Sequence, residues 1–176
     1  MAETRTGEVT FKGKPIELVG PRLKAGDKAP DFTCVGAGLN VVSLADTSGK
    51  PRIFNVVPSL DTPVCNRQTH RFAEELQSLG DRVAAYTVSL DLPFAQARFC
   101  TEAKIENMSN LSDVHNHSFG EGYGVLIRGL PIPLLARAVF IVDASDTIRY
   151  VEIVPEIAQE PTYEPALEAL RAAAGA

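Results

Sequence analysis

RIFNVV, residues 52–57, followed by PSLDTPVC, residues 58–65, is the part of the sequence most informative about the fold. The first segment is a compact apolar run of the kind that forms a buried central strand. The second segment is a loop that leads into a helix, because apolar residues recur with helical spacing across Phe72–Leu79 and Gly80 follows them. A buried strand that enters a helix through a short loop indicates an α/β domain.

The rest of the chain continues the alternation of strand and helix patterns. Apolar and polar residues alternate over Val9–Leu18 on both sides of the turn Lys12–Pro15, as in a β-hairpin. The further predicted elements are extended segments at 31–35 and 41–44, a strand at 83–90, a helix through 94–99, a weak helix at 115–121, a hairpin of 138–142 and 148–154, and a helix at 163–173. After the N-terminal β-hairpin, the order βαβα and then ββα predicts an α/β fold with a mixed central sheet flanked by helices on both faces.

Size and composition predict one globular domain, residues 1–176. The chain has 176 residues, of which 45% are hydrophobic and 22% are charged, and a single domain usually has roughly 100–200 residues. A net charge of −5 without basic clusters argues against a nucleic-acid partner. No apolar run approaches the roughly 18 residues of a membrane span, and MAETRTGEVTFKGK at the N-terminus lacks the apolar core of a secretory signal. We therefore expect a cytoplasmic protein with no membrane partner.

Cys65 has the most informative position among the three cysteines, Cys34, Cys65 and Cys100. An odd, sparse set without a CxxC pair argues against a disulfide framework or a zinc ribbon, and leaves reactive thiols, buried thiols or some of each. Cys65 is expected in the first turn of a helix, outside the carboxyl end of a strand, where α/β sheets bind ligands. The helix dipole and unpaired N–H groups favour a thiolate there. Cys34 alternates with Phe32 and is predicted to be a buried structural residue.

No other group of residues predicts a metal or cofactor site. The pair His115 and His117 lacks Cys or carboxylate ligands at metal spacing. His70 lies too far along the predicted helix to form a Cys–His hydrolase dyad. The glycines of Gly120–Gly124 resemble a phosphate loop but lack the following Lys-Ser/Thr. The rigid apolar loop Gly129–Pro133 fits a substrate or dimer surface.

Two segments resemble a known family. PSLDTPVC at 58–65 matches the PxxxTxxC active-site motif of peroxiredoxins. DLPFAQARFC at 91–100 is similar to the resolving-cysteine helix of the bacterial thiol peroxidases, the atypical two-cysteine subfamily. The similarity runs from Phe11 to about Leu170 and includes the step Ala136–Ala138. It implies a thioredoxin-like fold and a thiol-dependent peroxidase.

The resemblance implies a two-cysteine reaction cycle without metal, haem, flavin or nucleotide. Cys65 would be the peroxidatic thiolate, which attacks hydrogen peroxide or an organic hydroperoxide and becomes a sulfenic acid. Cys100 would be the resolving thiol, which forms an intrachain Cys65–Cys100 disulfide that thioredoxin reduces. Cysteines on successive helices rarely lie within the roughly 4.4–6.8 Å Cα separation of a disulfide, so we expect 60–70, 92–105 or both to loosen in each cycle. Members of this type usually form homodimers.

The resemblance also assigns roles to residues around Cys65. Thr62 is expected to turn its hydroxyl toward the thiolate and the peroxide, and it can cap the helix at the same time. Pro58 is expected to roof the pocket and exclude water. Arg137 is expected to bring a positive charge to the nucleophile and to the leaving oxygen. Helix-start geometry predicts that backbone N–H groups near Val64 and Cys65 help to bind the peroxide.

Two other functions remain open at this point. A peroxide-responsive redox sensor or binding module would use the same disulfide to change shape for a partner, and it would turn over poorly with a reductant. A thiol–disulfide oxidoreductase acting on proteins ranks below both, because the sequence has no CxxC motif.

Overall fold

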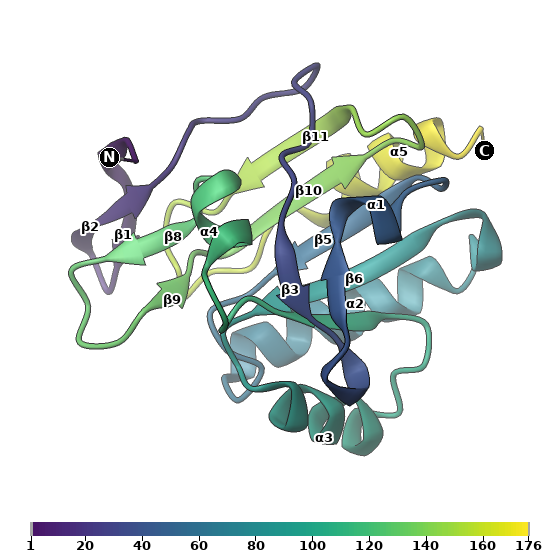
Figure 1. The fold of residues 1–176 in the computed structure, drawn as a ribbon, viewed down its shortest axis with the longest axis horizontal. Coiled ribbons are helices and arrows are strands. Elements are labelled where there is room, and N and C mark those ends of the chain that lie inside the picture. The colour runs from purple at the N-terminus through teal and green to yellow at the C-terminus, as the bar shows by residue number, and fades with distance from the viewer. Residues whose placement is uncertain (1, 176) are drawn as a thin grey trace.

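A seven-stranded mixed sheet forms the centre of the computed structural model, which describes residues 2–175 (Figure 1). The strand order is β11-β10-β5-β6-β7-β3-β4. Strands β5, β6 and β7 run parallel, and the other neighbouring pairs are antiparallel. The bounds are β3 Thr33–Val35, β4 Val41–Ser43, β5 Arg52–Val56, β6 Ala84–Ser89, β7 Ser109–Ser112, β10 Ala138–Val142 and β11 Ile148–Ile153. The predicted mixed sheet is confirmed.

A second, four-stranded antiparallel sheet carries the N-terminal hairpin, in the order β1-β2-β8-β9. Its strands are β1 Thr4–Phe11, β2 Lys14–Val19, β8 Leu126–Arg128 and β9 Leu134–Leu135. The predicted hairpin is confirmed, with its turn at Lys12 and Gly13, both in the left-handed region at φ 52° and 76°. At the other end of the hairpin the buried Arg5 guanidinium donates to the carbonyls of Gly20, Pro21 and Gly124. These bonds attach the start of β1 to the residues that follow β2 and to the residues that precede β8.

Helices lie on both faces of the seven-stranded sheet, as predicted. They are α1 Leu44–Thr47, α2 Pro63–Leu76, α3 Pro93–Ala103, α4 Ser118–Gly122 and α5 Tyr163–Ala173, with 3₁₀ turns η1 Ala37–Leu39 and η2 Gly80–Arg82. In Figure 1, α2 and α5 lie behind the sheet, and α4 packs on its other face. No helix within residues 2–175 is long and apolar enough to cross a bilayer.

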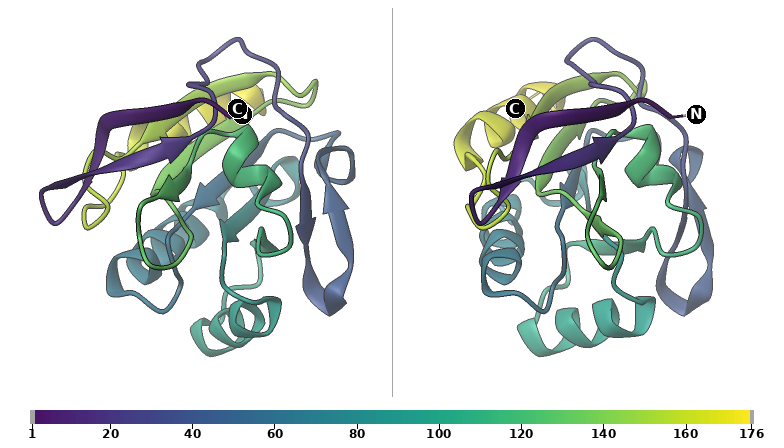
Figure 2. Two further views of the ribbon diagram at one scale, coloured as in Figure 1. Left: turned by 60° about the vertical axis from the view of Figure 1, so that its left-hand side comes forward. Right: turned by 90° about the vertical axis from the view of Figure 1, so that its left-hand side faces the viewer.

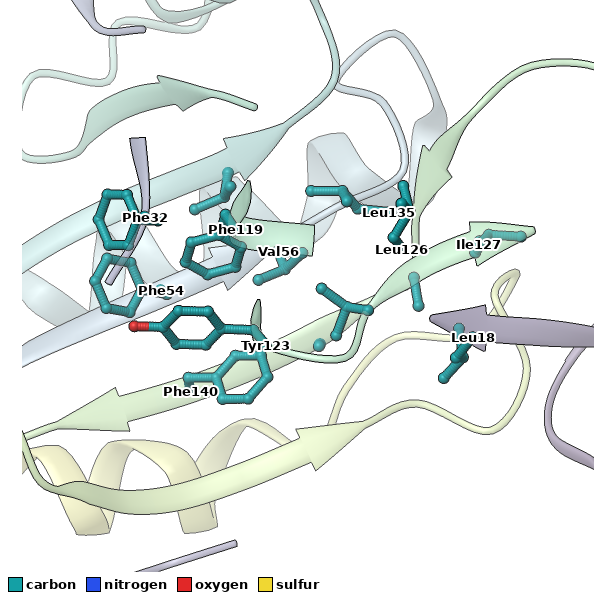
Figure 3. Close-up of a cluster of buried hydrophobic side chains, with 14 of the residues drawn as sticks. Leu18, Phe32, Phe54, Val56, Phe119, Tyr123, Leu126, Ile127, Leu135 and Phe140 are labelled. Atoms are coloured by element: carbon teal, nitrogen blue, oxygen red, sulfur yellow. The ribbon is translucent and has the colours of Figure 1, made fainter. Parts of the chain in front are cut away.

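Strand β5 is buried on both of its faces, which explains its uninterrupted apolar sequence. Phe54 and Val56 belong to the cluster under α4, whereas Ile53 belongs to the cluster under α2 and α5. Figure 3 shows the first cluster, in which aromatic rings from distant segments gather. The rings of Phe119 and Tyr123 stack there with centroids 4.0 Å apart. The two clusters fix β5 in the middle of the molecule, and the chain leaves its carboxyl end for the loop to α2.

Three strands were missing from the predicted order. β7 has the sequence SNLS, with a single apolar residue, and it forms through parallel pairing with β6. β8 and β9 are only three and two residues long. The weak helix predicted from His115 begins instead at Ser118, because His117 has a left-handed backbone at φ 58°. Helix α2 ends at Leu76, and Gly80 opens a separate 3₁₀ turn.

Candidate active site

Cys65 lies in the first turn of α2, directly after the loop that leaves β5. Thr62 is the N-cap residue with an extended backbone, and Pro63 occupies the first helical position, where its missing N–H costs nothing. The Cys65 side chain is completely buried. The predicted placement of this cysteine at a helix start, beyond the carboxyl end of a central strand, is confirmed.

The carboxylate of Asp91, in the loop that follows β6, holds the loop that precedes Cys65. Asp91 accepts hydrogen bonds from the Ser59 hydroxyl at 2.7 Å and from the Leu60 N–H at 2.8 Å. A third bond, from the Ser89 hydroxyl at 2.8 Å, fixes Asp91 to the end of β6. The segment 91–100 therefore helps to shape the segment 58–65. Sequence reasoning quoted both segments but gave Asp91 no role.

Arg137 reaches Cys65 from the strand next to β5. The antiparallel pairing of Ala138 with Val56 places Arg137 at the carboxyl end of β5, beside the loop. Its Nη2 donates to Cys65 Sγ at 3.3 Å, its Nη1 donates to Gln68 Oε1 at 2.8 Å, and its Nε donates to the Ile157 carbonyl at 2.8 Å. The structure thus brings together two residues that the sequence separates widely.

The electrostatics of this contact favour a negative sulfur. Arg137 is 2% exposed, and no carboxylate within residues 2–175 forms an ion pair with it. A buried cation without a counter-charge is costly. The positive charge of Arg137, which no acidic side chain among these residues neutralises, therefore faces Cys65 Sγ at 3.3 Å.

A buried chain of amides and hydroxyls supports Arg137, and sequence reasoning missed it. Gln68 Nε2 donates to Asn55 Oδ1 at 2.6 Å. Asn55 Nδ2 donates in turn to the hydroxyls of Thr69 at 3.1 Å and Thr87 at 3.3 Å. All four side chains are buried. Two features of the sequence could have indicated it. Gln68 lies three residues after Cys65, which places both on the same face of a helix, and Asn55 is a polar residue within an apolar strand.

Four of the predicted site residues line one apolar pocket of about 220 Å³. They are Pro58, Thr62, Val64 and Arg137. The remaining lining residues come from the loop before α2, the N-terminal hairpin, the β8–β9 region and the segment before α5, namely Ser59, Phe11, Leu130, Leu134, Ile157 and Ala158. Leu130 belongs to the loop Gly129–Pro133, which was expected at a substrate or dimer surface. Cys65 itself is not among the lining residues, but Val64 precedes it in the chain and Arg137 contacts its sulfur.

The Thr62 hydroxyl donates to the Ser59 carbonyl at 3.0 Å, within the loop before α2. Its side chain makes no N-cap hydrogen bond, although the Thr62 carbonyl accepts from the Asn66 N–H at 3.0 Å. The hydroxyl hydrogen of Thr62 is therefore engaged within the loop, whereas the lone pairs of its Oγ1 can still accept hydrogen bonds beside the pocket.

Cys100 lies in α3, and both it and Cys65 are free thiols. Its sulfur is half-buried and pairs with Asn110, whose Nδ2 donates to Sγ at 3.2 Å. The third thiol, Cys34, is fully buried and lies 3.7 Å from Asp113 Oδ1. Burial, and then the neighbouring carboxylate, raise the pKa of Cys34 far above its ordinary value. This environment keeps Cys34 protonated and supports its prediction as a structural residue.

The chain is similar to proteins of one family over most of its length. The Redoxin family pattern matches residues 24–167. Thiol peroxidases from Halalkalibacterium halodurans and Bacillus subtilis are 51% and 50% identical to it over 165 residues, which cover 94% of this chain and 98% and 97% of theirs. A solved peroxiredoxin-like protein from Aquifex aeolicus superimposes with a TM-score of 0.87 at 40% identity, over 96% of this chain and 98% of its own. A thiol peroxidase from Chromobacterium violaceum shares the fold, with a TM-score of 0.84 at 21% identity over 93% of this chain and 95% of its own.

These similarities agree with the fold and with the thiol at the β5–α2 junction. The chain belongs to the Redoxin family and, within it, to the thiol peroxidases. The resemblance drawn from residues 58–65 and 91–100 is confirmed, as are the thioredoxin-like fold and the class of thiol-dependent peroxidase.

Proposed function

We propose that this chain reduces hydrogen peroxide and organic hydroperoxides through Cys65. The thiolate attacks one peroxide oxygen, the O–O bond breaks, and Cys65 becomes a sulfenic acid. The electron pair of the broken bond leaves on the other oxygen, which takes up a proton and departs as water or an alcohol. The contact of 3.3 Å between Arg137 Nη2 and Cys65 Sγ, with no acidic partner for Arg137 in residues 2–175, carries this proposal.

Arg137 serves two stages of the attack. It stabilises the thiolate before reaction, and its guanidinium faces the negative charge that develops on the leaving oxygen. The first-turn N–H groups of α2, at Val64 and Cys65, have no partners within the helix and supply further donors to the peroxide. Thr62 contributes acceptor lone pairs, and Pro58 covers the pocket.

We further propose that Cys100 resolves the sulfenic acid. Its thiolate attacks the Cys65 sulfur, the sulfenic oxygen leaves as water after protonation, and an intrachain disulfide forms. Cys65 is buried in the first turn of α2, and Cys100, in α3, pairs with Asn110 of β7. Because cysteines on successive helices rarely lie within the roughly 4.4–6.8 Å Cα separation of a disulfide, we expect the first turn of α2, α3 or both to loosen when the disulfide forms. An external dithiol protein of the thioredoxin type then donates two electrons to the Cys65–Cys100 disulfide, which returns to two thiols while the dithiol is oxidised to a disulfide.

Two further proposals, on oligomeric state and on cellular location, rest on membership of the same family. We propose a homodimer, for which the loop containing Leu130 beside the pocket is one available surface. We also propose a cytoplasmic enzyme, because the proposed cycle needs thiols that a reducing compartment keeps reduced.

Turnover tests the function directly. Peroxide consumption is followed with thioredoxin, thioredoxin reductase and NADPH, for wild type, Cys65→Ser and Cys34→Ser. The account predicts sustained turnover by wild type and Cys34→Ser and none by Cys65→Ser. A single stoichiometric reaction without turnover would instead support the redox sensor. Full activity of Cys65→Ser would remove Cys65 from the mechanism.

A further inference from the structure

Glu156 fastens the tip of the N-terminal hairpin to the segment between β11 and α5. Its carboxylate accepts from the Thr10 hydroxyl at 2.7 Å and from the backbone N–H groups of Lys12 and Gly13, each at 3.1 Å. A fourth bond comes from the N–H of Ala158 at 3.1 Å. The Thr10 hydrogen bond and then that of Gly13 lower the pKa of Glu156 to about 2, so it is ionised at neutral pH. Figure 2 shows the hairpin tip beside this segment.

Backbone hydrogen bonds continue the attachment toward the active site. The Thr10 N–H donates to the Pro155 carbonyl at 2.7 Å, and the Ile157 N–H donates to the Thr10 carbonyl at 3.0 Å. The Ile157 carbonyl is the acceptor for Arg137 Nε. The hairpin tip and the catalytic arginine are thus bound to one short segment, 155–158.

Phe11 lies between the two residues that this attachment fixes. Thr10 and Lys12 are both held by Glu156, so the backbone of Phe11 has little freedom. Its ring is 36% exposed and lines the pocket that also contains Val64 and Arg137. A hydroperoxide that approaches Cys65 beside Arg137 from this pocket would extend its organic part along the apolar lining to which Phe11 belongs.

We propose that Phe11 contacts the organic substituent of hydroperoxide substrates, and that Glu156 is the positioning residue that holds Phe11 there. Glu156 itself does not line the pocket. The preference between organic hydroperoxides and hydrogen peroxide therefore depends on a carboxylate outside the binding site, because hydrogen peroxide has no substituent to reach Phe11. This inference rests on the proposed role of Cys65.

The test compares kcat/KM for cumene hydroperoxide and for hydrogen peroxide in wild type, Phe11→Ala, Glu156→Gln and Glu156→Ala. In the glutamine variant an amide nitrogen replaces one acceptor oxygen and faces backbone donors. Both Glu156 variants and Phe11→Ala are expected to lower the cumene-to-hydrogen-peroxide ratio roughly tenfold. The loss should appear in KM for cumene hydroperoxide rather than in kcat, because substrate contact and not chemistry is removed. Glu164→Gln, which removes an exposed charge paired with Arg171, is the matched control and should leave the ratio unchanged.

Each contrary outcome has a distinct meaning. An unchanged ratio in Phe11→Ala would refute the contact with the substituent. An altered ratio in Phe11→Ala with an unchanged ratio in both Glu156 variants would refute the positioning role. A uniform loss for both peroxides would also refute it, and would mean that Glu156 acts only through Arg137 or the fold. Failure of the proposed function looks different, since wild type would then reduce neither peroxide or Cys65→Ser would reduce both.

Discussion

Replacing Arg137 by glutamine tests the electrostatic basis of the site. The guanidinium is 2% exposed, and its Nη2 is 3.3 Å from Cys65 Sγ. At an effective dielectric constant of about 20, opposite unit charges 3.3 Å apart attract by about 5 kcal/mol. In the transition state the negative charge is shared between the sulfur and the leaving oxygen, so only part of this attraction is lost. Removal of one donor to a developing charge typically slows a reaction roughly 10²–10³-fold, which is the loss we expect for Arg137→Gln.

Two assays at neutral pH measure this loss. The first is kcat/KM for hydrogen peroxide, and the second is the rate at which iodoacetamide alkylates Cys65 in a Cys100→Ser background. Both should fall, because both require the thiolate. Arg137→Lys should fall between wild type and Arg137→Gln. A lysine keeps the charge but cannot bond Cys65, Gln68 and the Ile157 carbonyl in one fixed geometry.

Arg22→Gln is the control, since it removes an exposed arginine charge that is paired with Glu8 and does not contact Cys65. In this variant, the rate of Cys65 alkylation and kcat/KM for hydrogen peroxide should equal those of wild type. The reasoning would be refuted if Arg137→Gln, folded as judged by its circular dichroism spectrum and thermal melting, kept wild-type rates in both assays. A fall in turnover with unchanged alkylation would also contradict it, because the thiolate would then be formed without Arg137.

Three further perturbations probe the supports of the site. Gln68→Ala removes the partner of Arg137 Nη1 and of Asn55 Oδ1, and it should reduce the free energy of unfolding by roughly 1–3 kcal/mol in urea, compared with the exposed Gln77→Ala. Asp91→Asn weakens the bonds that hold the loop before Cys65 and should slow peroxide reduction with little change in melting temperature. The pKa of Glu156 is depressed to about 2, so its contribution to stability is complete above its ordinary value near 4.5 and is lost as the pH falls toward 2. Glu156→Gln should therefore lose less stability than wild type over that acid range, as measured by urea unfolding at each pH.

Each of these predictions has a result that contradicts it. Equal unfolding free energies for Gln68→Ala and Gln77→Ala would mean that the buried chain of amides adds nothing to stability. Unchanged peroxide kinetics in Asp91→Asn would mean that the loop keeps its shape without the carboxylate. Parallel stability curves for Glu156→Gln and wild type in acid would mean that the hairpin attachment persists after Glu156 is protonated.

The sequence was sufficient to predict the centre of the fold and the position of Cys65 within it. A strand buried on both faces has a continuous apolar sequence, and the helix after it has a clear apolar stripe, so the β5–α2 unit follows from local patterns. The position of Cys65 follows from that unit alone. By contrast, β7 could not be predicted from SNLS, because its strand conformation depends on pairing with β6 rather than on its own residues.

The surroundings of Cys65 depend on long-range pairing that no local pattern shows. Arg137 meets Cys65 because β10 pairs antiparallel with β5, and its role was expected only from the family resemblance. Asn55 is a polar residue within an apolar run, and the sequence does not show that Gln68 and two threonine hydroxyls satisfy its amide. Glu156 accepts from Lys12 and Gly13 because the hairpin turn folds back onto it, which no local pattern shows.

The central claim is that Cys65 is oxidised by peroxide and then joined to Cys100. Intact mass and peptide mapping after one equivalent of peroxide, on wild type, Cys65→Ser and Cys100→Ser, test it most directly. The account predicts the loss of two hydrogens and a Cys65–Cys100 crosslink in wild type, and a trapped sulfenic acid on Cys65 in Cys100→Ser. An oxidised Cys65 without a crosslink in wild type would assign Cys100 a structural role. An unmodified Cys65 would contradict the account altogether.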